Sequence, residues 1–156
     1  MILGIVGSES AKFTPHTEGI ARTLIRYLIN TSGSEVIVCS GHCPLGGVDI
    51  WAEEIAEELG KPLLIFPPKT RSWETGYKPR NLEIAEASDE VHVITLRELP
   101  PGYTGMKFPL CYHCRGRIGG HTKSGACWTA IQAERMGKRA AWHIIGNDTI
   151  TTEETL

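Results

Sequence analysis

The amino-acid sequence predicts an α/β fold with a doubly wound, mainly parallel sheet, helices on both faces and a Cys/His-rich insertion. Apolar runs alternate with helical patterns along most of the chain, as in the β-α-β units of a parallel sheet. Two glycine-rich loops each follow a predicted strand and open a helix. The length of 156 residues, 41% of them hydrophobic, suffices for one domain and is too short for two.

The first predicted elements are a strand, a helix and a second strand. Residues 2–7 form an apolar run that ends in Gly-Ser, which is typical of a buried strand. Thr17 can cap a helix over residues 17–30, where apolar side chains recur on one face. Residues 35–39 are apolar and β-branched, as expected for the second strand.

Two more helices and a strand follow. Residues 49–59 place apolar side chains on one face and glutamates on the other, and Gly60 closes this helix. Residues 63–66 form a short apolar run, which predicts the third strand. Pro79 comes after a loop rich in proline, arginine and aromatic residues, and it suits the first position of a helix over residues 79–88.

The last third of the chain contains an irregular segment. A fourth strand is predicted over residues 89–96, a fourth helix over 125–136 and a fifth strand over 139–145. Residues 97–123 hold three prolines and five glycines and show no sustained period. Such a segment is unusual in a compact domain unless it is functional or is held by something other than a core.

Composition and charge limit the classes of protein. The single domain is expected to span residues 1–146, with residues 147–156 as a flexible Thr/Glu-rich tail. The formal net charge of −2 gives no global attraction for nucleic acid or an anionic membrane. No apolar run approaches the length of a membrane span and Met1 leads directly into a strand, so a cytoplasmic location is expected. Five cysteines then favour metal binding or buried thiols over disulfides.

The first glycine-rich loop is a candidate phosphate site. Small residues let the backbone approach a phosphate, and the N–H groups at a helix start favour an anion. Gly41, Gly46 and Gly47 are therefore candidate ligand contacts, and Asp49 could hold a ribose hydroxyl. The alternative is an ordinary strand-to-helix turn that Asp49 caps.

Two later motifs carry similar chemistry. Arg80 and Asn81, at a predicted helix start near several aromatic residues, could bind a phosphate and orient a sugar. Alternatively, Arg80 pairs with an acidic neighbour. Ser124 and Gly125 open another helix, where the hydroxyls of Ser124 and Thr129 could bond phosphate oxygens. Here the alternative is a simple serine cap.

In this order the motifs resemble the SLOG superfamily, a group of Rossmann-like folds that includes DprA, the LOG enzymes and the molybdenum-cofactor carrier proteins. The resemblance covers most of the chain. It implies a nucleotide or nucleotide-derived ligand and often a homodimer. The ligand-binding residues that it implies are Gly7, Ser8, Gly41, Gly46, Gly47, Asp49, Arg80, Asn81, Ser124, Gly125 and Thr129.

Two features depart from the SLOG pattern. Gly7-Ser8 is followed by Glu9 where many members have arginine, so one expected phosphate contact is absent. The LOG phosphoribohydrolases carry a glutamate at the position where Gln132 stands, and Trp128 replaces a glycine of their loop. Because an amide cannot act as a general base, the sequence disfavours hydrolysis of the LOG type.

Binding of a nucleotide-type ligand is the preferred interpretation, and no redox cofactor is predicted. One alternative is a nucleotide-processing hydrolase that cleaves an N-glycosidic bond with a different carboxylate, for which Asp49 is the candidate catalytic residue. The other is DprA-like binding of single-stranded DNA through the insertion, which the acidic net charge disfavours.

Cysteines and histidines in and after the insertion predict a structural zinc site. A Cys-x2-Cys pair lets two thiolates bind one tetrahedral ion, and four protein ligands leave no open position for catalysis. The predicted ligands are Cys111, Cys114, His121 and Cys127. The rival ligands are His113, Cys39 and Cys43. Zinc would hold the irregular segment in shape; the alternatives are free thiols in a mobile loop and a reactive redox pair.

Overall fold

A computed structural model describes residues 1–155 and confirms the predicted α/β fold. The described residues form one six-stranded sheet with the order β3-β2-β1-β4-β5-β6. The strands are β1 (Ile2–Gly7), β2 (Ile37–Ser40), β3 (Leu63–Ile65), β4 (Glu90–Leu96), β5 (Arg139–Gly146) and β6 (Thr149–Glu154). The helices are α1 (Pro15–Asn30), α2 (Val48–Glu58), α3 (Lys78–Ala87) and α4 (Gly125–Arg135), with a 3-10 turn η1 (Ser10–Lys12) and a π-helical turn η2 (Trp73–Tyr77).

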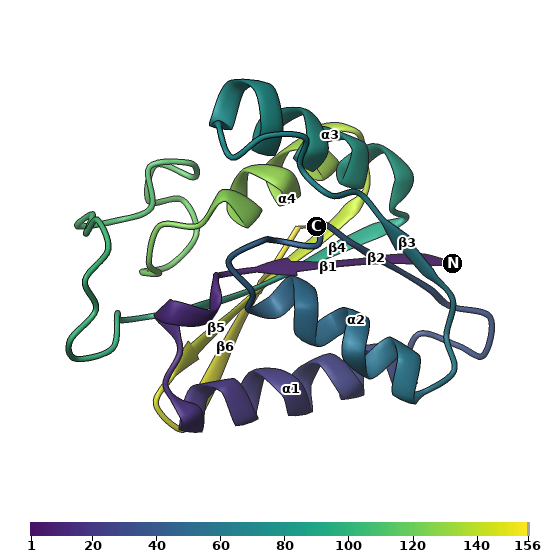
Figure 1. The fold of residues 1–156 in the computed structure, drawn as a ribbon, viewed down its shortest axis with the longest axis horizontal. Helices are drawn as coiled ribbons and strands as arrows, with labels where there is room; N and C mark the ends of the chain where they lie inside the picture. The colour runs from purple at the N-terminus through teal and green to yellow at the C-terminus, as the bar shows by residue number, and fades with distance from the viewer. Residues whose placement is uncertain (156) are drawn as a thin grey trace.

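The sheet is wound in two directions from its centre. Strands β1 to β5 are parallel, and the chain moves outward from β1 to β3 before it returns to β4 on the other side of β1. Helices α1 and α2 cover one face of the sheet, and α3 and α4 cover the other (Figure 1). The strand order therefore reverses between β1 and β4, and ligands of doubly wound sheets bind at such a point.

A separate apolar cluster packs on each face of the sheet. On the α1/α2 face, Ile25 and Ile55 are fully buried, and Phe13 meets Trp51 edge-on with ring centroids 4.8 Å apart. On the α3/α4 face, the cluster includes Ile84 and the fully buried Trp142. Burial on both faces explains why the parallel strands are near-continuous apolar runs.

Helix α1 begins two residues before the predicted start. Thr14, not Thr17, is its N-cap, and Pro15 occupies the first helical position. The Thr17 backbone N–H donates to Thr14 Oγ1 at 3.1 Å, and the Thr14 N–H donates to Thr17 Oγ1 at 2.8 Å. This reciprocal pair satisfies two N–H groups that the helix itself leaves without partners.

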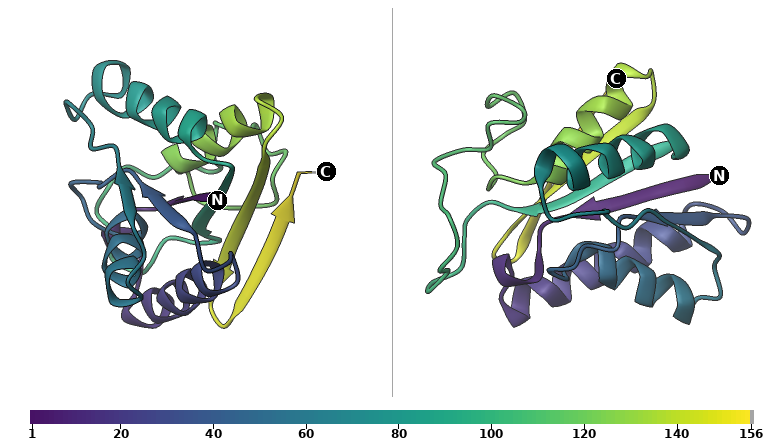
Figure 2. Two further views of the ribbon diagram at one scale, coloured as in Figure 1. Left: turned by 90° about the vertical axis from the view of Figure 1, so that its right-hand side faces the viewer. Right: turned by 45° about the horizontal axis from the view of Figure 1, so that its top comes forward.

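The expectation of a flexible tail is wrong for residues 149–154. They form β6, which pairs antiparallel with β5 at the edge of the sheet (Figure 2). Both faces of β6 are exposed, so no alternation of apolar residues marks it in the sequence. Its β-branched threonines suit a strand, and Arg139 Nη2 donates to Glu154 Oε1 at 2.7 Å. The domain thus extends through β6.

The irregular character of the insertion is confirmed. Between Leu96 and Gly125, a stretch that the structure describes completely, there is no helix or strand. This segment lies beyond the carboxyl ends of the parallel strands (Figure 1). Among the described helices, none is both long and apolar enough to cross a membrane.

Candidate functional site

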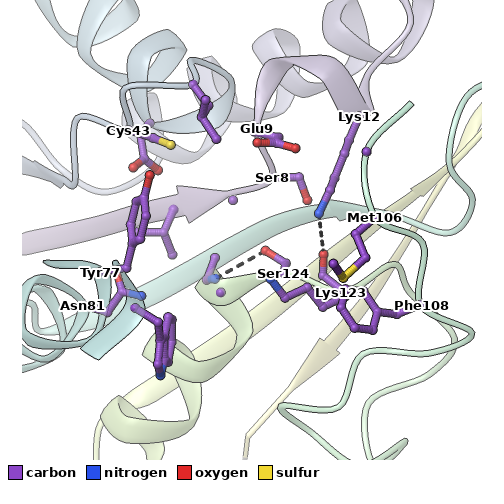
Figure 3. A pocket seen from close by; sticks show the side chains of 18 of the residues that line it. Ser8, Glu9, Lys12, Cys43, Tyr77, Asn81, Met106, Phe108, Lys123 and Ser124 are labelled. Carbon is purple, nitrogen blue, oxygen red and sulfur yellow. Dashed lines mark hydrogen bonds between the residues drawn. The ribbon is translucent and has the colours of Figure 1, made fainter. Parts of the chain in front are cut away.

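A cavity of about 430 Å³ opens at the carboxyl ends of β1 and β4, where the strand order reverses. Its walls come from the turn after β1, the loop before α2, the start of α3, the insertion and the start of α4 (Figure 3). The volume lies in the range of small-molecule sites, about 300–1,000 Å³. Position and size both make this cavity the candidate ligand site.

The cavity brings together most of the residues that the sequence singles out as ligand contacts. Those that line it are Gly7, Ser8, Asp49, Arg80, Asn81, Ser124 and Gly125. The remaining four, which do not belong to its lining, are Gly41, Gly46, Gly47 and Thr129. The first glycine-rich loop instead faces the cavity with Cys43 and Leu45.

Gly41 and Gly47 are required for close packing within the protein. A Cβ at Gly47 would collide with the backbone of Ser8 and Glu9, and the φ of +90° is unfavourable for other residues. A Cβ at Gly41 would collide with the Arg80 guanidinium. These glycines thus bring the loop against the walls of the cavity, and neither of them belongs to its lining.

Thr129 lies inside the protein. Its side chain is fully buried, and among the described residues its hydroxyl has no hydrogen-bond partner. Because it follows Ser124 by more than one turn of α4, it sits below the turn that faces the cavity. The predicted contact between Thr129 and a ligand is not supported by this position.

Asp49 and Arg80 form a buried ion pair at the base of the cavity. Arg80 Nη1 lies 3.6 Å from Asp49 Oδ2 and also donates to the Gly41 carbonyl oxygen, and Arg80 Nε donates to Asn81 Oδ1 at 2.8 Å. Burial raises the pKa of Asp49 to about 6, although Arg80 and the backbone N–H groups of Cys43 and Gly7 favour the charged form. The pair therefore joins the first glycine-rich loop to α3.

One side of the cavity is aromatic. Trp73 and Tyr77, both from the π-helical turn η2, line it beside Asn81. The Arg80 guanidinium lies 5.4 Å from the Tyr77 ring centroid, and the Trp73 ring meets Trp128 at 5.5 Å between centroids. These contacts hold flat apolar surfaces at the cavity wall, where a planar ring could stack.

The opposite side is basic. Figure 3 shows Lys12, Lys123 and Ser124 across the cavity from Tyr77 and Asn81. Lys12 Nζ donates to the Lys123 carbonyl oxygen at 2.7 Å, and burial lowers the pKa of Lys12. The N-terminus of α4, which Ser124 caps by accepting from the Ala126 N–H at 3.3 Å, adds the positive end of a helix dipole. The lysines and the helix N-terminus favour an anion here, whereas the carboxylate of Glu9, which also lines the cavity and acts on Lys12, opposes one.

Several lining residues are absent from the sequence-based prediction. Lys12 carries no signal of its own, because a single lysine in a short turn is common on any surface. Tyr103 and Phe108 belong to the aperiodic insertion. Glu9, which the sequence analysis mentions only because many SLOG proteins have arginine at its position, also lines the cavity. Its carboxylate accepts a hydrogen bond from the Tyr103 hydroxyl at 3.1 Å.

A second group of polar side chains lies beside the cavity, and we refer to it as the Cys/His cluster. Its members are Cys111, Cys114, His121 and Cys127, all buried, and their ligand atoms lie within 4.8 Å of one another. A group of three thiols and one imidazole in this arrangement could hold a metal ion. The predicted set of ligands is therefore assembled by the fold.

The surroundings of the Cys/His cluster orient its members. His121 Nδ1 donates to the Thr122 carbonyl oxygen at 2.8 Å, which leaves Nε2 directed at Cys114 Sγ, 3.4 Å away. Trp142 Nε1 donates to Cys127 Sγ at 3.3 Å. A hydrogen bond from Cys127 lowers the pKa of Cys111, and the same contact raises the pKa of Cys127. Thiolate is the form that binds metal.

The three rival ligands lie elsewhere. Cys39 is fully buried in the core within β2, and Cys43 lines the cavity. His113 packs against Tyr112 and Trp73, with ring centroids 4.4 and 5.3 Å away. None of the three belongs to the Cys/His cluster of the described chain.

Comparisons with family models, with curated proteins and with solved structures find no match to this chain. The geometry defines what the site can do. The cavity can hold an anion at its basic side and a flat ring at its aromatic side.

Proposed function

We propose that this protein binds a nucleotide or a nucleotide-derived ligand in the cavity between β1 and β4, as the resemblance to the SLOG superfamily implies. The observation that carries the proposal is the opposition of two surfaces within 430 Å³: lysines and a helix N-terminus on one side, and two aromatic rings on the other. A nucleoside phosphate has matching ends, an anion and a flat base, joined by a sugar.

The phosphate is assigned to the basic side. Lys12 and Lys123 supply cationic groups, and Ser124 and Gly125 present the first turn of α4. A phosphate at this position would receive charge-assisted hydrogen bonds from both kinds of donor. Ser8, which is buried beside this side of the cavity, adds a hydroxyl.

The nucleoside is assigned to the aromatic side. Trp73 and Tyr77 offer faces for stacking a base, an interaction worth about 1–3 kcal/mol per base in other proteins. Asn81 lies beside Tyr77 on the aromatic side and carries an amide that can bond sugar hydroxyls. Arg80 acts mainly by holding Asn81 and the first glycine-rich loop in place.

We assign zinc to the Cys/His cluster. Three cysteines and one histidine are a donor set that zinc prefers, with tetrahedral geometry and bonds of about 2.0–2.3 Å. All four side chains are buried, so the ion would have no open position for a substrate. A structural role follows, and chelation should lower the thermal stability of the protein.

The hydrolase alternative receives less support from the site. Asp49 already faces Arg80 and two backbone N–H groups, so its carboxylate is engaged in holding the loops. Gln132 lies outside the lining of the cavity, as far as the described residues define it. Binding therefore remains the preferred function, and DprA-like binding of single-stranded DNA stays the third candidate.

Native mass spectrometry of the freshly purified protein, compared with the denatured chain, tests both assignments at once. A retained zinc ion and a co-purified nucleotide are expected, and the native mass also reports the homodimer that the resemblance implies. Calorimetric titration with a panel of nucleoside 5′-monophosphates then ranks the ligands. Failure of every member of the panel to bind the zinc-loaded protein would overturn the proposal.

A pair of lysine variants makes the titration specific. Lys123→Ala removes a charge that lines the cavity, whereas Lys69→Ala removes an exposed charge outside its lining. The first variant should weaken binding of the best monophosphate about tenfold or more, and the second should leave the Kd unchanged. Equal effects would mean that the ligand occupies a different part of the molecule.

A further inference from the structure

The cavity and the Cys/His cluster share one short stretch of chain. His121 and Cys127 belong to the cluster, and residues 123–126, which lie between them, all line the cavity. The Cys127 N–H also donates to the Ser124 carbonyl oxygen at 3.1 Å, within the first turn of α4. Residues of the Cys/His cluster therefore lie immediately before and after the backbone segment that lines the cavity.

The outer wall of the cavity depends on the same cluster. Tyr103, Met106 and Phe108 line the cavity and precede Cys111 in the insertion. The stretch between β4 and α4, which the structure describes fully, contains no helix or strand. Apart from two cysteines of the cluster, its one buried apolar side chain is that of Ile118. A segment with so little buried apolar surface opens at a low cost in free energy.

The other ties of the insertion to the domain are polar and lie mostly at partly or fully exposed positions. They include the ion pair of Arg117 with Glu134 of α4, at 2.8 and 3.2 Å, and the hydrogen bond from Arg97 to Thr151 at 3.0 Å. The Thr122 N–H donates to the Leu96 carbonyl oxygen at 2.8 Å at the base of the segment. The Tyr103 hydroxyl donates to Glu9, and Lys12 donates to the Lys123 carbonyl oxygen, both at partly exposed positions. Such bonds exchange readily with water, so they stabilise the wall only slightly.

We propose that metal occupancy of the Cys/His cluster regulates the ligand cavity: the loaded protein binds its ligand, and the metal-free protein keeps its sheet but binds the ligand weakly. This inference rests on the proposed nucleotide-binding function. An ion bound to all four side chains joins the outer wall at Cys111 and Cys114 to the α4 turn at His121 and Cys127. Because the metal orders the cavity walls before the ligand binds, the free energy of ligand binding no longer includes the entropy cost of ordering them.

Thermodynamic linkage makes the coupling reciprocal. If the metal raises the affinity for the ligand by some factor, the ligand raises the affinity for the metal by the same factor. Couplings between two sites in one protein commonly amount to about 5–150-fold in affinity. The ratio of ligand affinities with and without the metal must therefore equal the ratio of metal affinities with and without the ligand.

The first measurement compares the Kd of the tightest-binding nucleoside 5′-monophosphate for zinc-loaded and chelated wild-type protein under reducing conditions. The Kd should rise at least fivefold on chelation while the far-ultraviolet circular dichroism of the sheet and helices persists. Cys111→Ser/Cys114→Ser should reproduce the chelated state. Cys39→Ala, which removes a buried cysteine outside the cluster, should keep both zinc and affinity.

The second measurement determines the affinity of wild-type protein for zinc. Equilibrium competition with a colorimetric chelator, with and without saturating monophosphate, should show that the nucleotide raises the zinc affinity by the same factor, at least fivefold. An unchanged zinc affinity, or an unchanged Kd in folded chelated protein, overturns the regulatory inference and leaves nucleotide binding intact. If the zinc-loaded protein binds no monophosphate, the proposed function and this inference fall together.

Discussion

The imidazole rings of His92 and His143 lie nearly parallel inside the sheet and meet edge to edge, with Nδ1 of His92 only 2.9 Å from Nε2 of His143. His92 Nε2 lies 3.0 Å from Glu90 Oε1, and His143 Nδ1 lies 3.0 Å from Thr152 Oγ1. One arrangement of protons satisfies every hydrogen bond in this series of four side chains while both imidazole rings stay neutral. Thr152 donates to His143, His143 donates to His92, and His92 donates to the Glu90 carboxylate.

The hydrogen-bonded pair of His92 and His143 predicts a loss of stability in mild acid. Burial lowers the pKa of His143 to about 4, and it also lowers the pKa of His92. The unfolded chain, with histidine pKa values near 6.5, therefore binds more protons as the pH falls from about 6.5 to about 4. The free energy of unfolding should drop by about 2 kcal/mol between pH 7.5 and pH 5 on account of His143.

Urea unfolding at several pH values in this range measures the effect. His143→Gln should flatten the dependence, whereas His16→Gln changes an exposed histidine and should preserve it. A slope that is the same in wild type and His143→Gln would show that other groups cause the acid sensitivity.

Replacing Gly47 by alanine should weaken both the fold and ligand binding. The new Cβ would meet the backbone of Ser8 and Glu9, which line the cavity, in addition to the strain of a φ of +90°. Gly60→Ala is the matched control, because Gly60 has a φ of +67° and open space around its Cβ. The control should cost about 1 kcal/mol in thermal unfolding and leave the Kd unchanged. Similar losses in both variants would argue against a packing role for Gly47.

Asp49→Asn should destabilise the protein by about 3 kcal/mol, because it leaves the Arg80 guanidinium buried without its countercharge. Asp148→Asn removes a carboxylate that is 83% exposed, and it should have no measurable effect on chemical denaturation. If the hydrolase alternative holds, wild type will release free base from a nucleoside monophosphate. Asp49→Asn would then lose that turnover while retaining its fold.

Thr129→Val should stabilise the protein by about 1 kcal/mol. The substitution replaces a buried hydroxyl that has no partner among the described residues by a methyl group of similar size. Thr17→Val serves as the contrast, since the Thr17 hydroxyl takes part in the reciprocal cap of α1 and its loss should destabilise by a similar amount. A weaker nucleotide Kd in Thr129→Val would instead support the sequence-based contact with the ligand.

The sequence predicts the parallel part of the fold well because each element carries a local signal. Five apolar runs and four amphipathic or capped segments correspond to β1 to β5 and α1 to α4, with ends that differ by about two residues. Strand β6 has no such signal. Its side chains are polar on both exposed faces, and its pairing with β5 depends on contacts that form only in the folded sheet.

The candidate site is predictable where spacing encodes chemistry. The Cys-x2-Cys pair with His121 and Cys127 is confirmed as one buried group. In contrast, the lining residues Lys12 and Tyr103 come from segments without periodicity, and only the folded chain brings them to one cavity. The glycines of the first loop illustrate a further difficulty, because a glycine required for packing and one required for a phosphate look alike in a sequence.

The central position of β1 has a consequence for the order of folding. Strand β1, which precedes the other described strands along the chain, pairs with β2 on one side and β4 on the other, and the Ser8–Thr95 hydroxyl contact spans 87 residues of chain. An emerging N-terminal half can pair β1, β2 and β3 early, whereas β4 must close a long loop before it docks. The cavity takes its walls from both halves, so it is complete only after α4 has been made.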